Sequence, residues 1–314
     1  MPAHNASATV EAAIRSVMLQ TVEDFELIVS DDGSTDDTPA RARRFDDPRV
    51  RFLTRDRAEG PSAARNAAIA VAHGEFVSMI DSDDLWLPSY LEVMGQALED
   101  DPDAGLAYTD AWVLDDETGR IRQKTAMAYQ RPPEVPPADP RRFVRLLVDD
   151  NFVFSHATVR RSVLEQVGDY DERLGWGEDF ELWLRILEAG YKAVRKAGPL
   201  AIYRRHSRSR TADLGRAYEG MCQTYTVILS EHALDDEARA IAHARYEWWL
   251  KQRDTFVHPS PLEHLLRVAR PIKNRLLDRT LWREEPPTDV AATLVACQEG
   301  GARSDHARPL SREL

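Results

Sequence analysis

The stretch FVSMIDSDDLWLP, residues 76–88, carries an apolar segment directly into three aspartates. Residues 75–80 form a short apolar run after a glycine, which predicts a buried strand. Asp81 and Asp83 stand two positions apart, so in an extended segment their side chains point the same way. Like charges this close are stable only with a cation, a proton or a hydrogen-bonded ligand, whereas Asp84 fits the following turn.

The N-terminal part of the chain alternates strands with helices. Strands separated by helices of ordinary length form βαβ units with right-handed crossovers. The sequence therefore predicts an α/β fold with a mixed, mainly parallel sheet flanked by helices. The strands predicted in this part cover residues 25–30, 50–54 and 75–80.

A second acidic pair, Asp31 and Asp32, follows the strand predicted over residues 25–30. Ligands of open α/β sheets bind beyond the carboxyl ends of the strands, where both acidic groups are expected. Oxygen-only ligands of this kind suit Mg²⁺ or Mn²⁺. A single aspartate before a helix is more often a cap, but two clusters on neighbouring strand ends favour a binding site.

Five motifs resemble, in order and spacing, those of the family 2 glycosyltransferases with the GT-A fold. The resemblance extends over residues 2–210. It implies an inverting transferase that uses a nucleotide-sugar donor, most often a UDP-sugar, and a divalent metal ion. The motifs are PAHN (2–5), DDGSTDDT (31–38), GPSAARNAAI (60–69), MIDSDDLWLP (79–88) and GEDFELWLRILEAGY (177–191).

The resemblance assigns several residues to the nucleotide. Asp32, with Asp31 beside it, matches the family's ligand of the base. Arg65 matches an arginine near the nucleotide, where a guanidinium can bind the base or the diphosphate, although a surface helix position is the alternative. Asp81 matches the contact to the ribose.

The resemblance also assigns the metal and the chemistry. Asp83 matches the metal ligand, and His206 resembles a histidine that some GT-A enzymes add to the metal, with a solvated basic loop as the alternative. Asp179 matches the catalytic base, with Glu178 as the second candidate. A carboxylate suffices because the acceptor oxygen becomes more acidic as its bond to carbon forms.

Two aromatic or imidazole side chains are candidates for contact with the sugar or the acceptor. Trp176 precedes the GED motif and can stack on a sugar face. His156 lies in a segment that often faces the acceptor in this family, although an interior histidine with satisfied hydrogen bonds is the more common case.

The N-terminal motif, Pro2 to Asn5, departs from the family pattern in two ways. Family members carry an apolar strand before this motif, whereas here Met1 is followed directly by Pro2. That strand lies in the middle of the family's sheet, so we expect either that the true start lies upstream or that the chain folds poorly without it. His4 stands where the family often has an aromatic ring on the base, so the base preference is less firmly implied.

Three parts are expected along the chain. Residues 1–210 form the transferase domain, residues 211–285 a helical C-terminal extension, and residues 286–314 a disordered tail without periodicity. Within the extension, residues 261–282 have the pattern of a basic amphipathic helix. Such a helix can lie on an anionic membrane, but it more often covers its own domain.

The composition restricts which classes of molecule can be partners of the chain and where the chain is located. A net charge of −12 argues against nucleic acid as the main partner. Two distant cysteines fit a reducing compartment, and no apolar run reaches the roughly 18 residues of a membrane span. We therefore expect a cytoplasmic protein, peripheral at the inner membrane face if the basic helix binds lipid, with a glycan or lipid-linked acceptor.

Two other functions remain open on the sequence alone. A nucleotidyltransferase would also place metal-binding carboxylates on an α/β sheet, but its phosphate loop needs glycine and lysine, and PAHNASATVEAA has neither. A non-catalytic nucleotide-sugar or cation-binding module would need no equivalent of Asp179.

Overall fold

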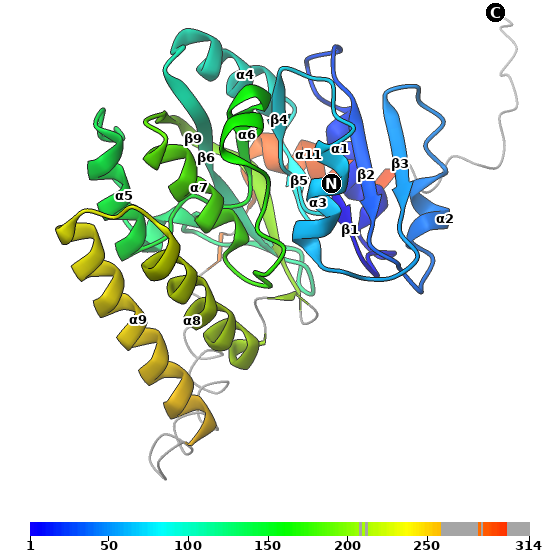
Figure 1. The fold of residues 1–314 in the computed structure, drawn as a ribbon. Helices are drawn as coiled ribbons and strands as arrows, with labels where there is room; N and C mark the ends of the chain where they lie inside the picture. Colours follow the sequence, from blue (N-terminus) through cyan, green and yellow to red (C-terminus); the bar gives the residue numbers. More distant parts are fainter. Residues whose placement is uncertain (207–208, 211–212, 259–281, 284, 300–314) are drawn as a thin grey trace, which may run out of the picture.

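The computed structural model describes residues 1–206, 209–210, 213–258, 282–283 and 285–299. Its strands form two sheets with helices packed around them, and a helical hairpin projects from one end (Figure 1). The hairpin consists of α8 (Leu214–Glu231) and α9 (Asp236–Val257). The predicted α/β fold and the helices after the transferase core are therefore confirmed.

The smaller sheet carries the first acidic pair. It has three parallel strands in the order β1-β2-β3: β1 (Pro2–Ala3), β2 (Leu27–Asp31) and β3 (Val50–Thr54). All five residues of β2 are buried, as expected for an apolar run inside a parallel sheet. Asp31 is the last residue of β2 and pairs with Ala3 and Thr54. An upstream extension of the first strand stays a prediction.

The larger sheet is not mainly parallel, and this part of the prediction is wrong. Its order is β4-β8-β6-β9-β5, with β7 beside β6, and only β6 and β9 run parallel to each other. An apolar run shows that a strand is buried but does not show the direction of its neighbours. The strands are β4 (Phe76–Ser78), β5 (Leu85–Trp86), β6 (Ala104–Asp115), β7 (Arg120–Ile121), β8 (Ala157–Arg160) and β9 (Lys192–Arg205).

Helices cover both sheets and join their strands. The segment from β4 to β5 carries Asp81, Asp83 and Asp84, so the acidic motif lies between two strands of the larger sheet. The remaining described helices are α1 (Val10–Met18), α2 (Thr38–Ala42), α3 (Pro61–Ile69), α4 (Tyr90–Asp100), the short 3₁₀ helix η1 (Met127–Tyr129), α5 (Pro140–Asp149), α6 (Arg161–Val167), α7 (Glu178–Glu188) and α11 (Thr288–Glu299).

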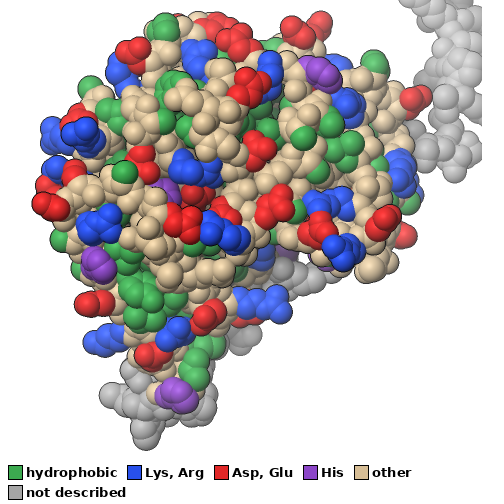
Figure 2. All heavy atoms as spheres, viewed as in Figure 1, with side chains coloured by type: hydrophobic (Ala, Val, Ile, Leu, Met, Phe, Trp, Pro, Cys, Tyr) green, Lys and Arg blue, Asp and Glu red, His purple; other side chains and the backbone are tan. Residues whose placement is uncertain are grey.

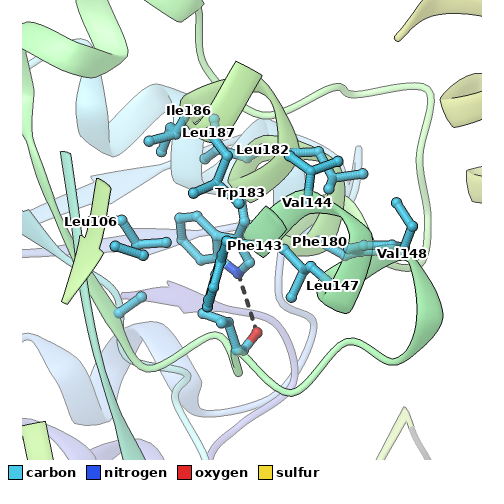
Figure 3. Close-up of a cluster of buried hydrophobic side chains, with 14 of the residues drawn as sticks. Leu106, Phe143, Val144, Leu147, Val148, Phe180, Leu182, Trp183, Ile186 and Leu187 are labelled. Carbon is cyan, nitrogen blue, oxygen red and sulfur yellow. Dashed lines mark hydrogen bonds between the residues drawn. The ribbon is translucent and has the colours of Figure 1, made fainter. Parts of the chain in front are cut away.

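The largest core packs around α7. Trp183 is fully buried between Phe143, Phe180 and neighbouring aliphatic side chains, and its indole Nε1 donates to the carbonyl oxygen of Val153 at 3.2 Å (Figure 3). Apolar residues at three- and four-residue spacing give α7 this buried face. The core therefore fixes α7 and, with it, the acidic residues at its N-terminus.

Before Glu299, the C-terminal part of the chain contains a packed helix, α11, and is not a disordered tail. In α11, Val290 is fully buried and Cys297 is 4% exposed, against a cluster that includes Leu85 and Leu87. The prediction of disorder over residues 286–314 is therefore wrong for α11, because scattered apolar residues suffice when another element supplies the packing surface. The basic amphipathic helix predicted over residues 261–282 lies outside the described residues except for its last residue.

Acidic and basic side chains are interspersed over the face of the molecule drawn in Figure 2.

The described helices include no candidate for a membrane span, because none combines sufficient length with sufficient hydropathy.

A buried histidine joins α7 to the C-terminal hairpin. His232, between α8 and α9, has a 3% exposed side chain and contacts Glu188 at 3.0 Å and Glu181 at 3.3 Å. Burial alone would lower the pKa of His232, but the two glutamates outweigh it and raise the pKa to about 9. The charged imidazole therefore stabilises the packing of the hairpin on α7.

The stability contributed by His232 should depend on pH. Because its folded pKa is raised, the contribution is complete below the unfolded value of about 6.5 and is lost as pH rises through about 9. Between pH 6.5 and pH 9.5, the free energy of unfolding measured with denaturant should decrease by about 3 kcal/mol more in the native chain than in His232→Gln. The control is His243→Gln, which changes an exposed histidine and should show the same decrease as the native chain. Equal pH dependence in the native chain and His232→Gln would refute this role.

Candidate active site

The three aspartates of the DSDD motif have three different partners. Asp81 accepts hydrogen bonds from Arg65 at 2.6 Å and from Ser155 at 3.1 Å. Asp83 lies 3.2 Å from the Nε2 atom of His206. The chain itself therefore supplies cationic or hydrogen-bonding partners for charges that would otherwise repel one another.

Asp84 closes the turn over residues 81–84 through its backbone N–H, which donates to the carbonyl oxygen of Asp81 at 3.1 Å, but its carboxyl group is buried and has other partners. It is 1% exposed, its Oδ1 accepts from the backbone N–H of Arg204, and its Oδ2 lies 2.9 Å from Nε2 of His156. The contact to His156 has an ion-pair distance without the alignment of a hydrogen bond. Burial raises the pKa of Asp84. The pair ties β9 and the segment before β8 to the acidic loop.

His156 is an interior residue. Only 2% of its surface is exposed, and its ring faces Asp84. Its two ring nitrogens have no hydrogen-bond partner among the described residues, so the histidine is interior without the satisfied hydrogen bonds of the alternative. Its contact with an acceptor stays a prediction. No local pattern indicates the pairing with Asp84, because the two residues come from segments that only the sheet topology brings together.

Arg65 is the central cation of the site. Its side chain is 6% exposed, and its two terminal nitrogens donate to Asp81 at 2.6 Å and to Glu178 at 2.8 Å. The guanidinium also lies over the ring of Tyr170, 5.2 Å from the centroid. Arg65 thus connects α3 to the acidic loop and to the first residue of α7. It is a buried residue rather than the surface helix arginine raised as an alternative.

Arg65 keeps the carboxyl groups of its two partners ionised. Burial would raise the pKa of Asp81, but Arg65 outweighs it and lowers the pKa to about 2. Burial would likewise raise the pKa of Glu178, and the attraction of Arg65 and Arg210 holds it below the usual range. Both carboxylates are therefore ionised at neutral pH.

Asp179 differs from its neighbour. Its Oδ1 accepts from the backbone N–H of Phe180 at 2.7 Å, and the residue is partly exposed. Burial of the carboxyl group, followed by the charge of Glu178, raises the pKa of Asp179 to about 7. When two adjacent carboxyl groups have clearly different pKa values, the group with the higher pKa can act as the base while the other stays ionised. This supports Asp179 rather than Glu178 as the base.

Asp83 and His206 form a pair suited to a divalent metal. Their side chains are 33% and 20% exposed, so both reach the solvent. A carboxylate oxygen and an imidazole nitrogen are ligands that Mn²⁺ accepts, and Mg²⁺ accepts the carboxylate. The described residues contain no cluster of three such ligands. Phosphate oxygens and water would therefore have to complete the coordination.

The acidic pair after β2 anchors two loops. Asp32 is 4% exposed and accepts from the backbone N–H groups of Glu59 at 2.9 Å and Gly60 at 2.8 Å. Asp31 accepts from the N–H of Ser34 at 3.3 Å. Each oxygen of Asp32 keeps a second lone pair. Contact of Asp31 and Asp32 with a base stays a prediction.

The N-terminal motif lies against the same loop. His4 contacts the carbonyl oxygen of Asp32 through Nδ1 at 2.8 Å, and Asn5 contacts the other ring nitrogen at 3.0 Å. Pro2 lies in β1 beside Ser30. The structure thus brings Pro2, His4 and Asn5 close to Asp32, and their contact with the donor stays a prediction.

One face of Trp176 is covered by Arg210, which belongs to the basic sequence YRRHSRSR of residues 203–210. Arg210 lies 5.1 Å from the centroid of the Trp176 ring and 3.3 Å from Glu178. Stacking of Trp176 on a sugar stays a prediction. Arg210 belongs to the basic segment 203–210, and only the structure shows that it faces Glu178.

Comparison with known proteins identifies the family. The fold is similar to that of solved GT-A glycosyltransferases. The chain belongs to glycosyl transferase family 2, whose sequence pattern matches residues 1–168. The match ends before Asp179, so the expected base and the C-terminal helices lie beyond it.

Three proteins illustrate the similarity. Succinoglycan biosynthesis protein ExoU of Rhizobium meliloti (strain 1021) is 34% identical over 270 residues, which are 82% of this chain and 75% of ExoU. The Escherichia coli UDP-Glc:alpha-D-GlcNAc-diphosphoundecaprenol beta-1,3-glucosyltransferase WfgD is 43% identical over 93 residues, 30% of this chain and 37% of WfgD. The mannosyltransferase PcManGT of Pyrobaculum calidifontis, solved with GDP-Man and Mn²⁺, has a TM-score of 0.58 at 19% identity and covers 97% of this chain and 86% of its own.

Removal of Arg65 should test how far the fold depends on this cation. Arg65→Met removes the partner of the buried carboxylate of Glu178 and of the partly exposed carboxylate of Asp81, and we expect the free energy of unfolding to fall by about 3 kcal/mol. Adding Glu178→Gln to that variant should restore part of the loss, because one stranded charge is removed. Arg210→Met is the matched control, since Arg210 contacts the same Glu178 with a side chain that is 47% exposed. If Arg65→Met is no less stable than this control in urea unfolding, the buried pairs contribute nothing measurable.

Proposed function

We propose that the chain moves a sugar from a UDP-sugar to a hydroxyl group of a glycan or lipid-linked acceptor, with inversion, during synthesis of a surface polysaccharide or glycolipid. The observation that carries the proposal is the cluster in which Arg65 joins Asp81 of the DSDD motif to Glu178, with Asp179 beside it in the first turn of α7. Family membership decides against a nucleotidyltransferase and against a non-catalytic module.

The relatives support the choice of donor and acceptor. WfgD is named for a UDP-glucose donor and a diphosphoundecaprenol-linked acceptor, and ExoU for the biosynthesis of succinoglycan. We extend both to this chain as substrate classes: a UDP-sugar and a polysaccharide or lipid-linked intermediate. The cytoplasmic location, with membrane contact through residues 261–282, is proposed on the basic amphipathic sequence of that segment.

The proposed reaction is a single displacement. The acceptor hydroxyl oxygen bonds to the anomeric carbon from the face opposite the diphosphate, and its proton passes to a carboxylate oxygen of Asp179. The bond between the anomeric carbon and the phosphate oxygen breaks, and its electron pair stays with the diphosphate. Asp179 is suited to this step because a pKa near 7 makes it a stronger base than an ordinary carboxylate.

The other residues hold the donor and balance charge. We assign the base to Asp31 and Asp32 with Pro2, His4 and Asn5 nearby, and the ribose to Asp81. A divalent ion at Asp83 and His206, Mg²⁺ or Mn²⁺, would supply positive charge to the departing diphosphate. Arg65 donates two of its five N–H groups to carboxylates, and its Nε has no partner among the described residues, so its expected contact with the nucleotide would use a remaining donor.

Asp179→Asn should test the base. We expect the rate of sugar transfer to fall by about 10³-fold, while UDP binding stays within twofold of the native chain. In the native enzyme, kcat/KM should rise tenfold per pH unit below about 7 and level off above it, because only ionised Asp179 accepts the proton. A variant that keeps more than a tenth of the activity would remove Asp179 from the proposed role.

Calorimetric titration with UDP should test the metal pair. UDP should bind more tightly with Mn²⁺ than with EDTA, and Asp83→Asn should abolish most of this difference. Asp116→Asn is the control, because Asp116 pairs with Arg204 close to the same segment and is assigned no ligand role. A metal effect that survives in Asp83→Asn would place the ion elsewhere.

A further inference from the structure

One turn of α8 contacts the two residues that precede α7. The hydroxyl of Thr224 donates to the carbonyl oxygen of Trp176 at 2.5 Å and lies 3.0 Å from the carbonyl oxygen of Gly220 in its own helix. Thr224 is fully buried. The C-terminal hairpin thus reaches the segment on which the GED motif begins.

Gly220 and Gly177 allow this contact to be close. A methyl group on Gly220 would overlap the Cβ of Trp176, and a Cβ on Gly177 would lie 3.0 Å from the Thr224 hydroxyl. Gly220 and Thr224 are one helical turn apart, so they share one face of α8. Backbone and side chain of Trp176 are therefore both fixed by the same turn.

The position of these residues sets where α7 begins. Gly177 is the N-cap of α7, has a φ of 65°, and its carbonyl oxygen accepts from the N–H of Glu181 at 3.0 Å. This left-handed conformation favours glycine. Glu178 and Asp179 follow at once, so a shift of Gly177 moves both carboxyl groups. Arg65 holds Glu178 from the other side.

We propose that the Gly220–Thr224 turn of α8 positions the catalytic base. Gly220 and Thr224 are positioning residues: they hold Trp176 and Gly177 so that Asp179 keeps its place relative to the donor. The inference rests on the proposed role of Asp179. It makes the C-terminal hairpin, which lies outside the part matched by the family pattern, a component of the active site.

Two isosteric substitutions in α8 provide the test. Thr224→Val removes the hydroxyl that holds Trp176. Thr226→Val is the matched control, because Thr226 donates to Cys222 in its own helix at 2.9 Å on the exposed face. We expect Thr224→Val to lower kcat by ten- to a hundredfold, with the donor KM within twofold of the control, since misplacement of a reacting group costs rate rather than binding. Thr224→Ser keeps the hydroxyl and should recover at least a third of the native kcat.

Hydrogen exchange gives a readout that does not depend on activity. Amides in a peptide over residues 175–182 should exchange at least tenfold faster in Thr224→Val than in Thr226→Val. Equal exchange in the two variants overturns the inference, as does faster exchange with an unchanged kcat or a failure of Thr224→Ser to recover activity. If Asp179→Asn keeps its activity, the proposed base is wrong, and the exchange result still decides whether α8 fixes this segment.

Discussion

The buried guanidinium of Arg65 is the interaction on which the site depends. It joins α3, the acidic loop after β4 and the first residue of α7, three segments that are distant in the sequence. A planar cation with several donors can satisfy two carboxylates at once, whereas the ammonium of lysine acts as a single point charge. Arg65 keeps Asp81 and Glu178 ionised, whereas burial and the charge of Glu178 raise the pKa of the neighbouring Asp179.

The pairing of charges also explains how three aspartates are accommodated in the acidic loop. The buried Arg65 neutralises Asp81, and the buried Asp84 lies against His156, while Asp83 faces the more exposed His206. Charges that are paired internally hold the loop in one conformation, and the pair nearer to solvent is left for a ligand. In this loop, Asp81 and Asp84 thus stabilise the structure, and Asp83 is left for a ligand.

The sequence predicted the positions of single strands better than it predicted the larger sheet, and the roles of the site residues stay predictions. Strands β2, β3 and β4 lie at the predicted positions because continuous apolar runs identify buried strands, and the pairing of Asp83 with His206 follows the order of the motifs. Strand direction in the larger sheet was missed because burial patterns do not encode it. The pairing of Asp84 with His156 and the packing of α11 were missed for a related reason: both depend on contacts between remote segments, which no local pattern records.

The packing of α11 has a consequence for synthesis of the chain. Val290 and Cys297 complete a cluster that includes Leu85 and Leu87, which follow the aspartates directly. Until α11 has been synthesised and has packed, this apolar surface beside the acidic loop stays open to water. Contacts between such distant segments form late and slow folding, and exposed apolar surface on a partly folded chain promotes aggregation. The segment that carries α11 therefore protects the surface beside the acidic loop as the chain folds.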